Sequence, residues 1–72
     1  MNEHVELVRL GKAFRRVRER EGVTVAELVV RTGIDARQIT ALEAGRLDPA
    51  FDVMCALADG IGVRSSTLFP ED

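Results

Sequence analysis

A short segment, residues 36–44, carries side chains whose types suit contact with the base edges of a nucleic acid. Arg37 has a fork of donors that fits the O6 and N7 acceptors of guanine, and Gln38 can pair with adenine or with a phosphate. Thr40 and Ala41 are small enough to touch a thymine methyl group. The segment has the chemistry of a base-reading surface, provided that some element presents these side chains together.

A helix over this segment would present them on one face. With Ile39 and Leu42 turned inward, a rotation of about 100° per residue turns the opposite face outward. That face comprises Arg37, Thr40, Ala41 and Ala44, with Ala36 and Gln38 at its flanks. Small residues there would let the helix backbone approach a groove closely. The same positions also suit an ordinary solvated helix face, so the residue types alone leave both interpretations open.

Catalytic and metal-binding chemistry is not indicated by the sequence. The chain has one histidine, His4, and one cysteine, Cys55, which are too few ligands for a zinc site. It has no tyrosine, and no glycine-rich phosphate loop of the right pattern is present. We therefore expect no enzyme activity, no metal and no cofactor.

Length and composition predict one small globular domain over residues 1–72, with its core at about 7–69. The chain is 46% hydrophobic and 31% charged, with a mean hydropathy of +0.01. Its apolar runs fall far short of the roughly 20 residues of a membrane helix, and residues 1–4 lack the basic and apolar regions of a signal peptide. We expect a cytoplasmic protein without a membrane partner.

Charge is unevenly distributed along the chain, although the net charge is −2. Residues 9–20 contain six basic side chains and one acidic one, whereas residues 47–72 contain one basic and five acidic ones. The basic ridge of the first helix consists of Arg9, Lys12, Arg16 and Arg20, opposite an apolar stripe of Leu7, Leu10, Phe14 and Val17. We interpret the ridge as a solubilising face, or as a source of phosphate attraction if it turns toward DNA.

Glycines and capping residues divide the chain into five predicted helices and no strand. The helices are expected at about 4–20, from 24 to 33, from 35 to 44, from 48 to 61 and from 65 to 69. Thr24 and Glu27 form a capping-box pattern, and Asp48 with Pro49 is typical of an N-cap and a first helical residue. Only residues 33–35 separate the second and third helices, which predicts a steep crossing and a helix-turn-helix, although generic helical hairpins give similar patterns.

Five pieces of the chain, in this order and spacing, carry a family resemblance. They are VTVAEL at 23–28, TGID at 32–35, ITALEAG at 39–45, Pro49, and Leu57-Ala58 followed by Ile61-Gly62-Val63. The chain resembles the Xre/Cro-repressor family of bacterial and phage DNA-binding regulators over residues 10–69. The resemblance implies an all-α, five-helix, lambda-repressor-like fold. It also implies a sequence-specific transcriptional regulator of duplex DNA, with the helix at 36–44 in the major groove.

The resemblance assigns roles to individual residues. The expected DNA-binding residues are Thr24, Val25, Ala36, Arg37, Gln38, Thr40, Ala41 and Arg46. Free N–H groups at Thr24 and Val25, at the start of the second helix, are predicted to bind phosphate. Val25 stands where the family commonly has glutamine, so one side-chain contact to phosphate is missing. Arg18 and Glu43 are expected to form an ion pair between the first and third helices.

A homodimer on a two-fold symmetric operator is expected, because one helix reads only about four or five base pairs and two copies multiply specificity. The candidate dimer surfaces are a cluster of Val63, Leu68 and Phe69 and a pair formed by Val5 and Val8. Two alternatives stay open: a protein-interaction adaptor of the same fold with weak or no DNA binding, and an antitoxin or the control protein of a restriction system.

Overall fold

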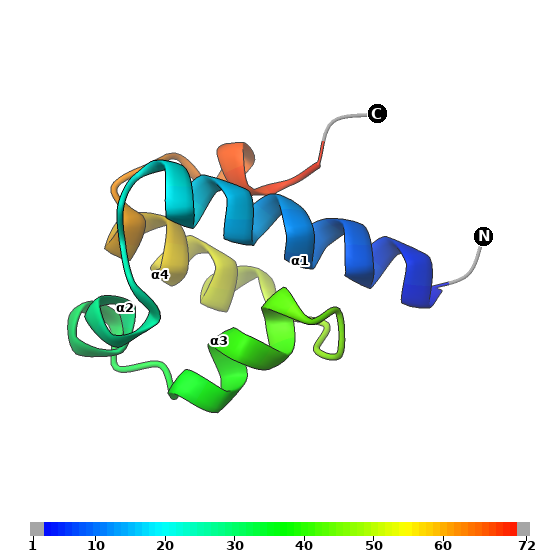
Figure 1. Cartoon of the computed structure of the whole chain (residues 1–72), viewed down its shortest axis with the longest axis horizontal. Coiled ribbons are helices and arrows are strands. Elements are labelled where there is room, and N and C mark those ends of the chain that lie inside the picture. The colour runs from blue at the N-terminus through cyan, green and yellow to red at the C-terminus, as the bar shows by residue number, and fades with distance from the viewer. Residues whose placement is uncertain (1–2, 71–72) are drawn as a thin grey trace.

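The computed structural model describes residues 3–70, which form four α-helices and one 3-10 helix (Figure 1). The elements are α1 (Glu3–Arg20), α2 (Val25–Thr32), α3 (Ala36–Glu43), α4 (Phe51–Ile61) and η1 (Ser65–Leu68). The described part of the chain contains no strand, so the predicted all-helical architecture is confirmed.

The predicted count of five helices is not confirmed, because the last segment is only one 3-10 turn. In η1 the Thr67 N–H donates to the Arg64 carbonyl three residues earlier. Phe69 is extended, at φ −88° and ψ 140°. The residue before a proline is disfavoured in the α region, so Pro70 limits the segment to this single turn.

The predicted start of the fourth helix at Asp48 and Pro49 is also wrong. α4 begins at Phe51, after an extended Ala50 that supplies no side-chain cap. Leu47 packs against the core, and the chain has to span the distance from α3 to the start of α4. An extended chain covers about 3.3 Å per residue against 1.5 Å in a helix, which favours an extended connection.

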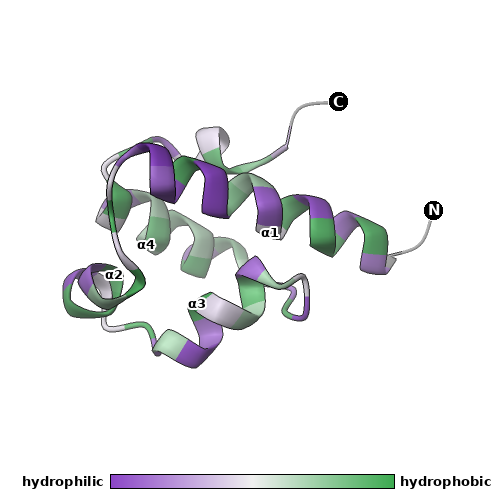
Figure 2. Ribbon diagram, viewed as in Figure 1, coloured by the Kyte–Doolittle hydropathy of each residue, from purple (hydrophilic) through white to green (hydrophobic). Residues whose placement is uncertain are grey.

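The core lies where the four helices and η1 meet. α1 packs against α3 and against η1, while α2 packs against α3 and α4. The fully buried large side chains are Phe14, Leu28, Ile39, Leu42, Met54, Leu57 and Leu68. Figure 2 shows α4 as mostly apolar and α1 with hydrophilic residues along its outer side. Among residues 3–70, no helix combines the length and apolarity needed to cross a membrane.

Two of the predicted dimer-surface residues are used inside the chain. Leu68 is 0% exposed, so it cannot face a second copy. Val8 is half-buried and lies against Gly45, where an added Cβ would come within 2.8 Å of the Val8 Cα. Val5 and Phe69 are exposed. The sequence pattern around Leu68 and Val8 gave no indication of these contacts. They form only when η1 and the turn after α3 pack onto the rest of the folded chain.

Candidate nucleic-acid interface

The amino-terminal end of α2 is closed by the predicted capping box. The Glu27 N–H donates to the Thr24 hydroxyl at 3.0 Å, and the Thr24 N–H donates to a Glu27 carboxylate oxygen at 3.0 Å. The expectation of a free Thr24 N–H is therefore wrong, because this N–H donates a hydrogen bond to Glu27. In the part of the chain that the structure describes, the N–H groups of Val25 and Ala26 have no acceptor. These two donors can receive an anion at this helix end.

Glu27 also places a negative charge at this helix end. Two hydrogen bonds with Thr24 hold the pKa of Glu27 below its usual range. The bond from the Thr24 backbone N–H has the larger effect, and the bond with the Thr24 side chain has the smaller one. The carboxylate lies 3.3 Å from the Arg31 guanidinium, which offsets part of the charge. An approaching phosphate therefore meets both free N–H donors and a carboxylate.

We predict that Glu27→Gln weakens the pH dependence of stability. Because the pKa of Glu27 is lower in the folded chain than its ordinary value of about 4.3, the ionised carboxylate stabilises the fold above that pH. The stabilisation is lost as the pH falls through the folded pKa. Melting temperatures measured stepwise between about pH 6 and pH 3 should fall less steeply for the variant than for the parent chain. Parallel curves would contradict the assignment.

The turn between α2 and α3 is fixed by short hydrogen bonds. The Thr32 hydroxyl donates to the Leu28 carbonyl at 2.6 Å and accepts from the Ile34 N–H at 3.1 Å. The Asp35 carboxylate caps α3 by accepting from the Arg37 N–H at 2.7 Å. Figure 1 shows α2 nearly end-on and α3 lengthwise, so the two helices cross steeply, as the three-residue connection predicts.

The outer face of α3 is open to solvent. Ile39 and Leu42 are buried, whereas Arg37, Thr40 and Ala44 are exposed. Ala36 is exposed as well, while Gln38 and Ala41 are half-buried at the edges of the face. The face therefore has the small residues and the hydrogen-bonding side chains that the sequence placed there. Its length of eight residues, about 12 Å, is comparable with the width of a DNA major groove.

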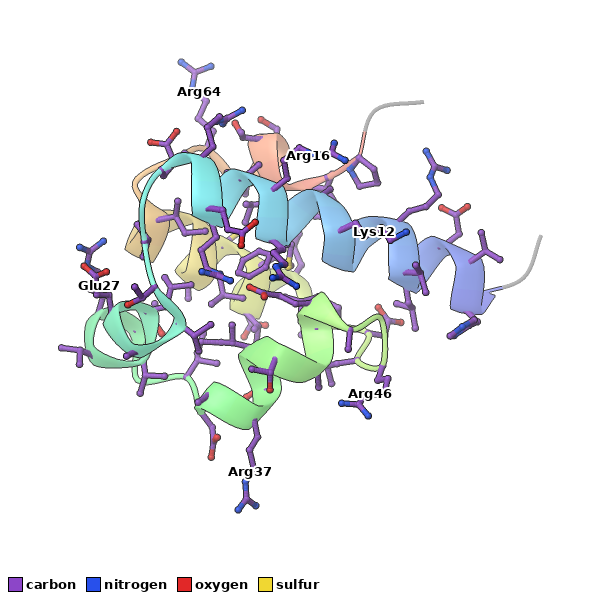
Figure 3. All side chains as sticks on the ribbon, in the orientation of Figure 1. Lys12, Arg16, Glu27, Arg37, Arg46 and Arg64 are labelled. Carbon is purple, nitrogen blue, oxygen red and sulfur yellow. The ribbon has the colours of Figure 1, made fainter. Side chains whose placement is uncertain are left out.

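Arg37 is the most prominent polar group of this face. Its side chain extends away from the fold (Figure 3) and forms no ion pair with the described residues. The Thr40 hydroxyl donates to the Arg37 carbonyl at 3.2 Å, so it remains able to accept. The guanidinium of Arg37 keeps all of its donors for an external partner.

The carboxyl end of α3 turns sharply and brings Arg46 to the same side of the molecule. Gly45 has φ +75°, a left-handed conformation that glycine adopts readily. The Arg46 N–H donates to the Ala41 carbonyl at 2.9 Å and the Gly45 N–H to the Leu42 carbonyl at 3.1 Å, which is a Schellman motif. Figure 3 shows Arg46 and Arg37 pointing away from the fold on the same side.

An ion pair between Arg18 and Glu43 connects α1 to the last residue of α3. The Arg18 Nε donates to Glu43 Oε2 at 2.6 Å, and Nη2 donates to Oε1 at 3.1 Å. The third guanidinium nitrogen donates to the Val23 carbonyl at 2.9 Å. The two side chains are only 12% and 11% exposed. The hydrogen bond to Glu43 raises the pKa of Arg18 against the opposing effect of burial.

Gly11 is a positioning residue that the sequence interpretation missed. A Cβ at this position would lie 2.7 Å from the Glu43 carbonyl oxygen and closer still to that of Leu42. Only glycine therefore allows α1 to approach the carboxyl end of α3 so closely. The available signal was a glycine inside a helical apolar pattern, where its low helix propensity calls for a packing reason.

The structure thus brings most of the predicted residues to one side of the chain. Ala36, Arg37, Thr40 and Arg46 are exposed there, whereas the Thr24 N–H donates to Glu27 and is not available to a phosphate. The polar and backbone contacts between α1 and α3 gather at the carboxyl end of α3. Two short helices held in this arrangement define the helix-turn-helix class of proteins.

Comparisons with known proteins agree with this class. A family model described as a helix-turn-helix domain matches residues 9–70. The uncharacterised HTH-type transcriptional regulator y4dJ of Sinorhizobium fredii is 33% identical over 54 residues, which cover 75% of this chain and 70% of the relative. The chain belongs to the helix-turn-helix family of transcriptional regulators, as the family resemblance in the sequence predicted.

Two solved structures share the fold. The restriction-modification controller protein C.AhdI from Aeromonas hydrophila superposes with a TM-score of 0.84 at 23% identity, covering 90% of this chain and 98% of the controller. A hypothetical transcription factor, NHTF, from Neisseria superposes with a TM-score of 0.79 at 25% identity, covering 96% of this chain and 79% of that protein.

Proposed function

We propose that this chain binds specific duplex DNA as a transcriptional regulator, with α3 in the major groove. The observation that carries the proposal is the open face of α3, where Arg37 extends from small neighbours. Arg37 supplies a bidentate donor to guanine, and Gln38 supplies a flanking polar contact. Arg46 and the free N–H groups of Val25 and Ala26 hold the phosphate backbone on either side. A regulator of this kind acts where the chromosome lies, which in a bacterium is the cytoplasm.

Selection from a pool of random duplexes tests this function. A sequence-specific reader enriches one family of sequences, and its affinity falls steeply between about 50 mM and 200 mM salt, because phosphate contacts release counterions. Weak binding that shows no enrichment would remove the proposal and favour a protein-interaction adaptor of the same fold.

Arg37→Ala and Arg46→Ala are predicted to weaken DNA binding in different ways. Loss of Arg37 should cost about 1–3 kcal/mol and relax the preference at one base position. Loss of Arg46 should weaken binding to all duplexes alike. It should also reduce, by about 1, the slope of the logarithm of the binding constant against the logarithm of the salt concentration. Both side chains are exposed, so the melting temperature should stay nearly unchanged. If Arg37→Ala lowered the affinity for selected and random duplexes equally, that result would contradict base readout by Arg37.

The proposed regulator acts as two copies on a two-fold symmetric operator. Half-sites about 34 Å apart would each receive one α3 helix. Val5 and Phe69 are the exposed members of the surfaces predicted for the dimer. Sedimentation of a monomer alone, both free and on the selected duplex, would reject this part of the proposal.

A further inference from the structure

The basic ridge of α1 lines a groove that the proposed DNA interface leaves unused. The groove lies between α1 and η1 with the residues after it, and its volume is about 680 Å³. Its lining comprises Arg9, Lys12, Ala13, Arg16, Val17 and Arg20 from α1, and Ser66, Thr67, Phe69 and Pro70 from the opposite wall. We call it the α1/η1 groove.

The α1/η1 groove faces away from α3. Gly11 marks the side of α1 that touches α3. At about 100° per residue, Arg16 lies roughly 140° further around the same helix. Figure 3 shows Arg16 on the side of the molecule opposite Arg37 and Arg46. A duplex seated on α3 therefore leaves the groove accessible.

The groove combines a row of cations with an apolar floor. Lys12 and Arg16 are exposed and have no ion-pair partner among the side chains that the structure describes. Ala13 and Val17 lie between the cations and η1, and Phe69 is 41% exposed on the other wall. Such a surface suits a ligand that carries both carboxylates and apolar side chains.

The dimensions of the cationic row favour a peptide segment over a small anion. The four cations recur at spacings of three, four and four residues and extend about 16 Å along α1. Arg9 and Arg20, at the two ends of the row, also pair with the exposed Glu6 and Glu21. Carboxylates recurring every three or four residues on a partner helix would match this row. The second wall, lined by Ser66, Thr67, Phe69 and Pro70, adds no cation to the row and presents apolar surface, which favours an amphipathic peptide over a nucleic-acid backbone.

We propose that the α1/η1 groove binds an acidic amphipathic segment of a partner protein. The carboxylates of that segment pair with Lys12 and Arg16, and its apolar residues cover Phe69 and Ala13. This proposal does not depend on the proposed DNA binding, since it uses the opposite face of the chain. It assigns Phe69 to the peptide, which leaves Val5 as the exposed residue for contact between copies.

The test uses the full chain and a synthetic helical peptide of about 16 residues, with glutamate at every third or fourth position and leucine beside it. A matched peptide carries glutamine in place of each glutamate. Fluorescence anisotropy should show binding of the glutamate peptide only. The double substitution Lys12→Glu with Arg16→Glu should weaken this binding about tenfold or more. Amide shifts in nuclear magnetic resonance spectra should map to α1 and η1.

A second double variant controls for net charge. Arg37→Glu with Arg46→Glu changes the net charge by the same amount on the opposite face, and it should change peptide affinity by less than about twofold. Both variants alter exposed side chains, and thermal unfolding checks that each is folded.

Four outcomes would overturn the proposal. Three concern the peptide: no binding of the glutamate peptide, equal weakening of peptide binding by both double variants, and amide shifts confined to α3. The fourth is altered sedimentation of the Lys12→Glu, Arg16→Glu chain without peptide, which would make the groove a contact between copies. A random duplex that loses affinity only in this variant would assign the groove to nucleic acid instead.

Discussion

Replacing Glu43 with alanine is expected to lower the free energy of unfolding by about 3 kcal/mol, the lower end of the range for a buried ion pair, because it leaves a largely buried charge without its partner. Arg18 is 12% exposed and directs two guanidinium nitrogens at Glu43. A chain of 72 residues has a total stability of roughly 4–11 kcal/mol. The variant therefore loses a large part of its stability, and its melting temperature and its proposed DNA affinity should fall together.

Glu19→Ala is the matched control for this prediction. Glu19 is also a glutamate paired with an arginine, Arg15, but both side chains are more than half exposed. Such a pair contributes about 1 kcal/mol or less, so its loss should change the melting temperature little. Unchanged thermal unfolding of Glu43→Ala would remove the claim that the buried pair stabilises the fold.

A double substitution separates stability from orientation. Arg18→Met with Glu43→Leu removes both charges, and apolar replacement of a buried pair is often neutral or stabilising. If the pair also orients α3, this variant should regain thermal stability yet bind the selected duplex more weakly than the parent chain. Full recovery of DNA affinity would show that the pair has no orienting role.

Gly11→Val is expected to give the second large loss, about 3 kcal/mol, at the upper end of the range for overpacking. Its Cβ would meet the carbonyl oxygens of Leu42 and Glu43, which are backbone atoms and cannot rotate away. α3 must therefore shift or separate from α1. Thermal unfolding measures the loss, and DNA affinity measured well below the melting temperature reports the displacement of α3.

Lys12→Val controls for the effect of a β-branched residue inside α1. Lys12 is exposed, so this variant should show only the small difference in helix propensity, about 0.5 kcal/mol. Similar destabilisation at positions 11 and 12 would mean that the contact with α3 does not explain the effect of Gly11→Val.

The parts of the fold that the sequence predicted correctly depend on residues close together in the chain. The Thr24 and Glu27 capping box and the ends of α2 and α3 follow from local hydrogen bonding and glycine conformation. The inward positions of Ile39 and Leu42 follow from helical periodicity. Arg18 and Glu43 are 25 residues apart in the chain, and only the family resemblance indicated that they form an ion pair.

The missed features depend on contacts between distant segments. Leu68 is buried and Val8 touches Gly45 because η1 and the turn after α3 fold back onto α1. α4 begins at Phe51 rather than at Asp48, after a connection in which Leu47 packs against the core. Neither fact can be obtained from periodicity or capping patterns, which describe one segment at a time.

The clustering of α1 contacts at one end of α3 makes that end a pivot. Gly11, Arg18 and the Gly45 turn hold the carboxyl end against α1, while Ala36 and Arg37 lie at the opposite end, which is held by the turn from α2. Over a lever of about 12 Å, a tilt of roughly 5° moves the far end by about 1 Å. If α3 reads bases as proposed, substitutions at the pivot would retune operator preference without altering a single base-contacting side chain.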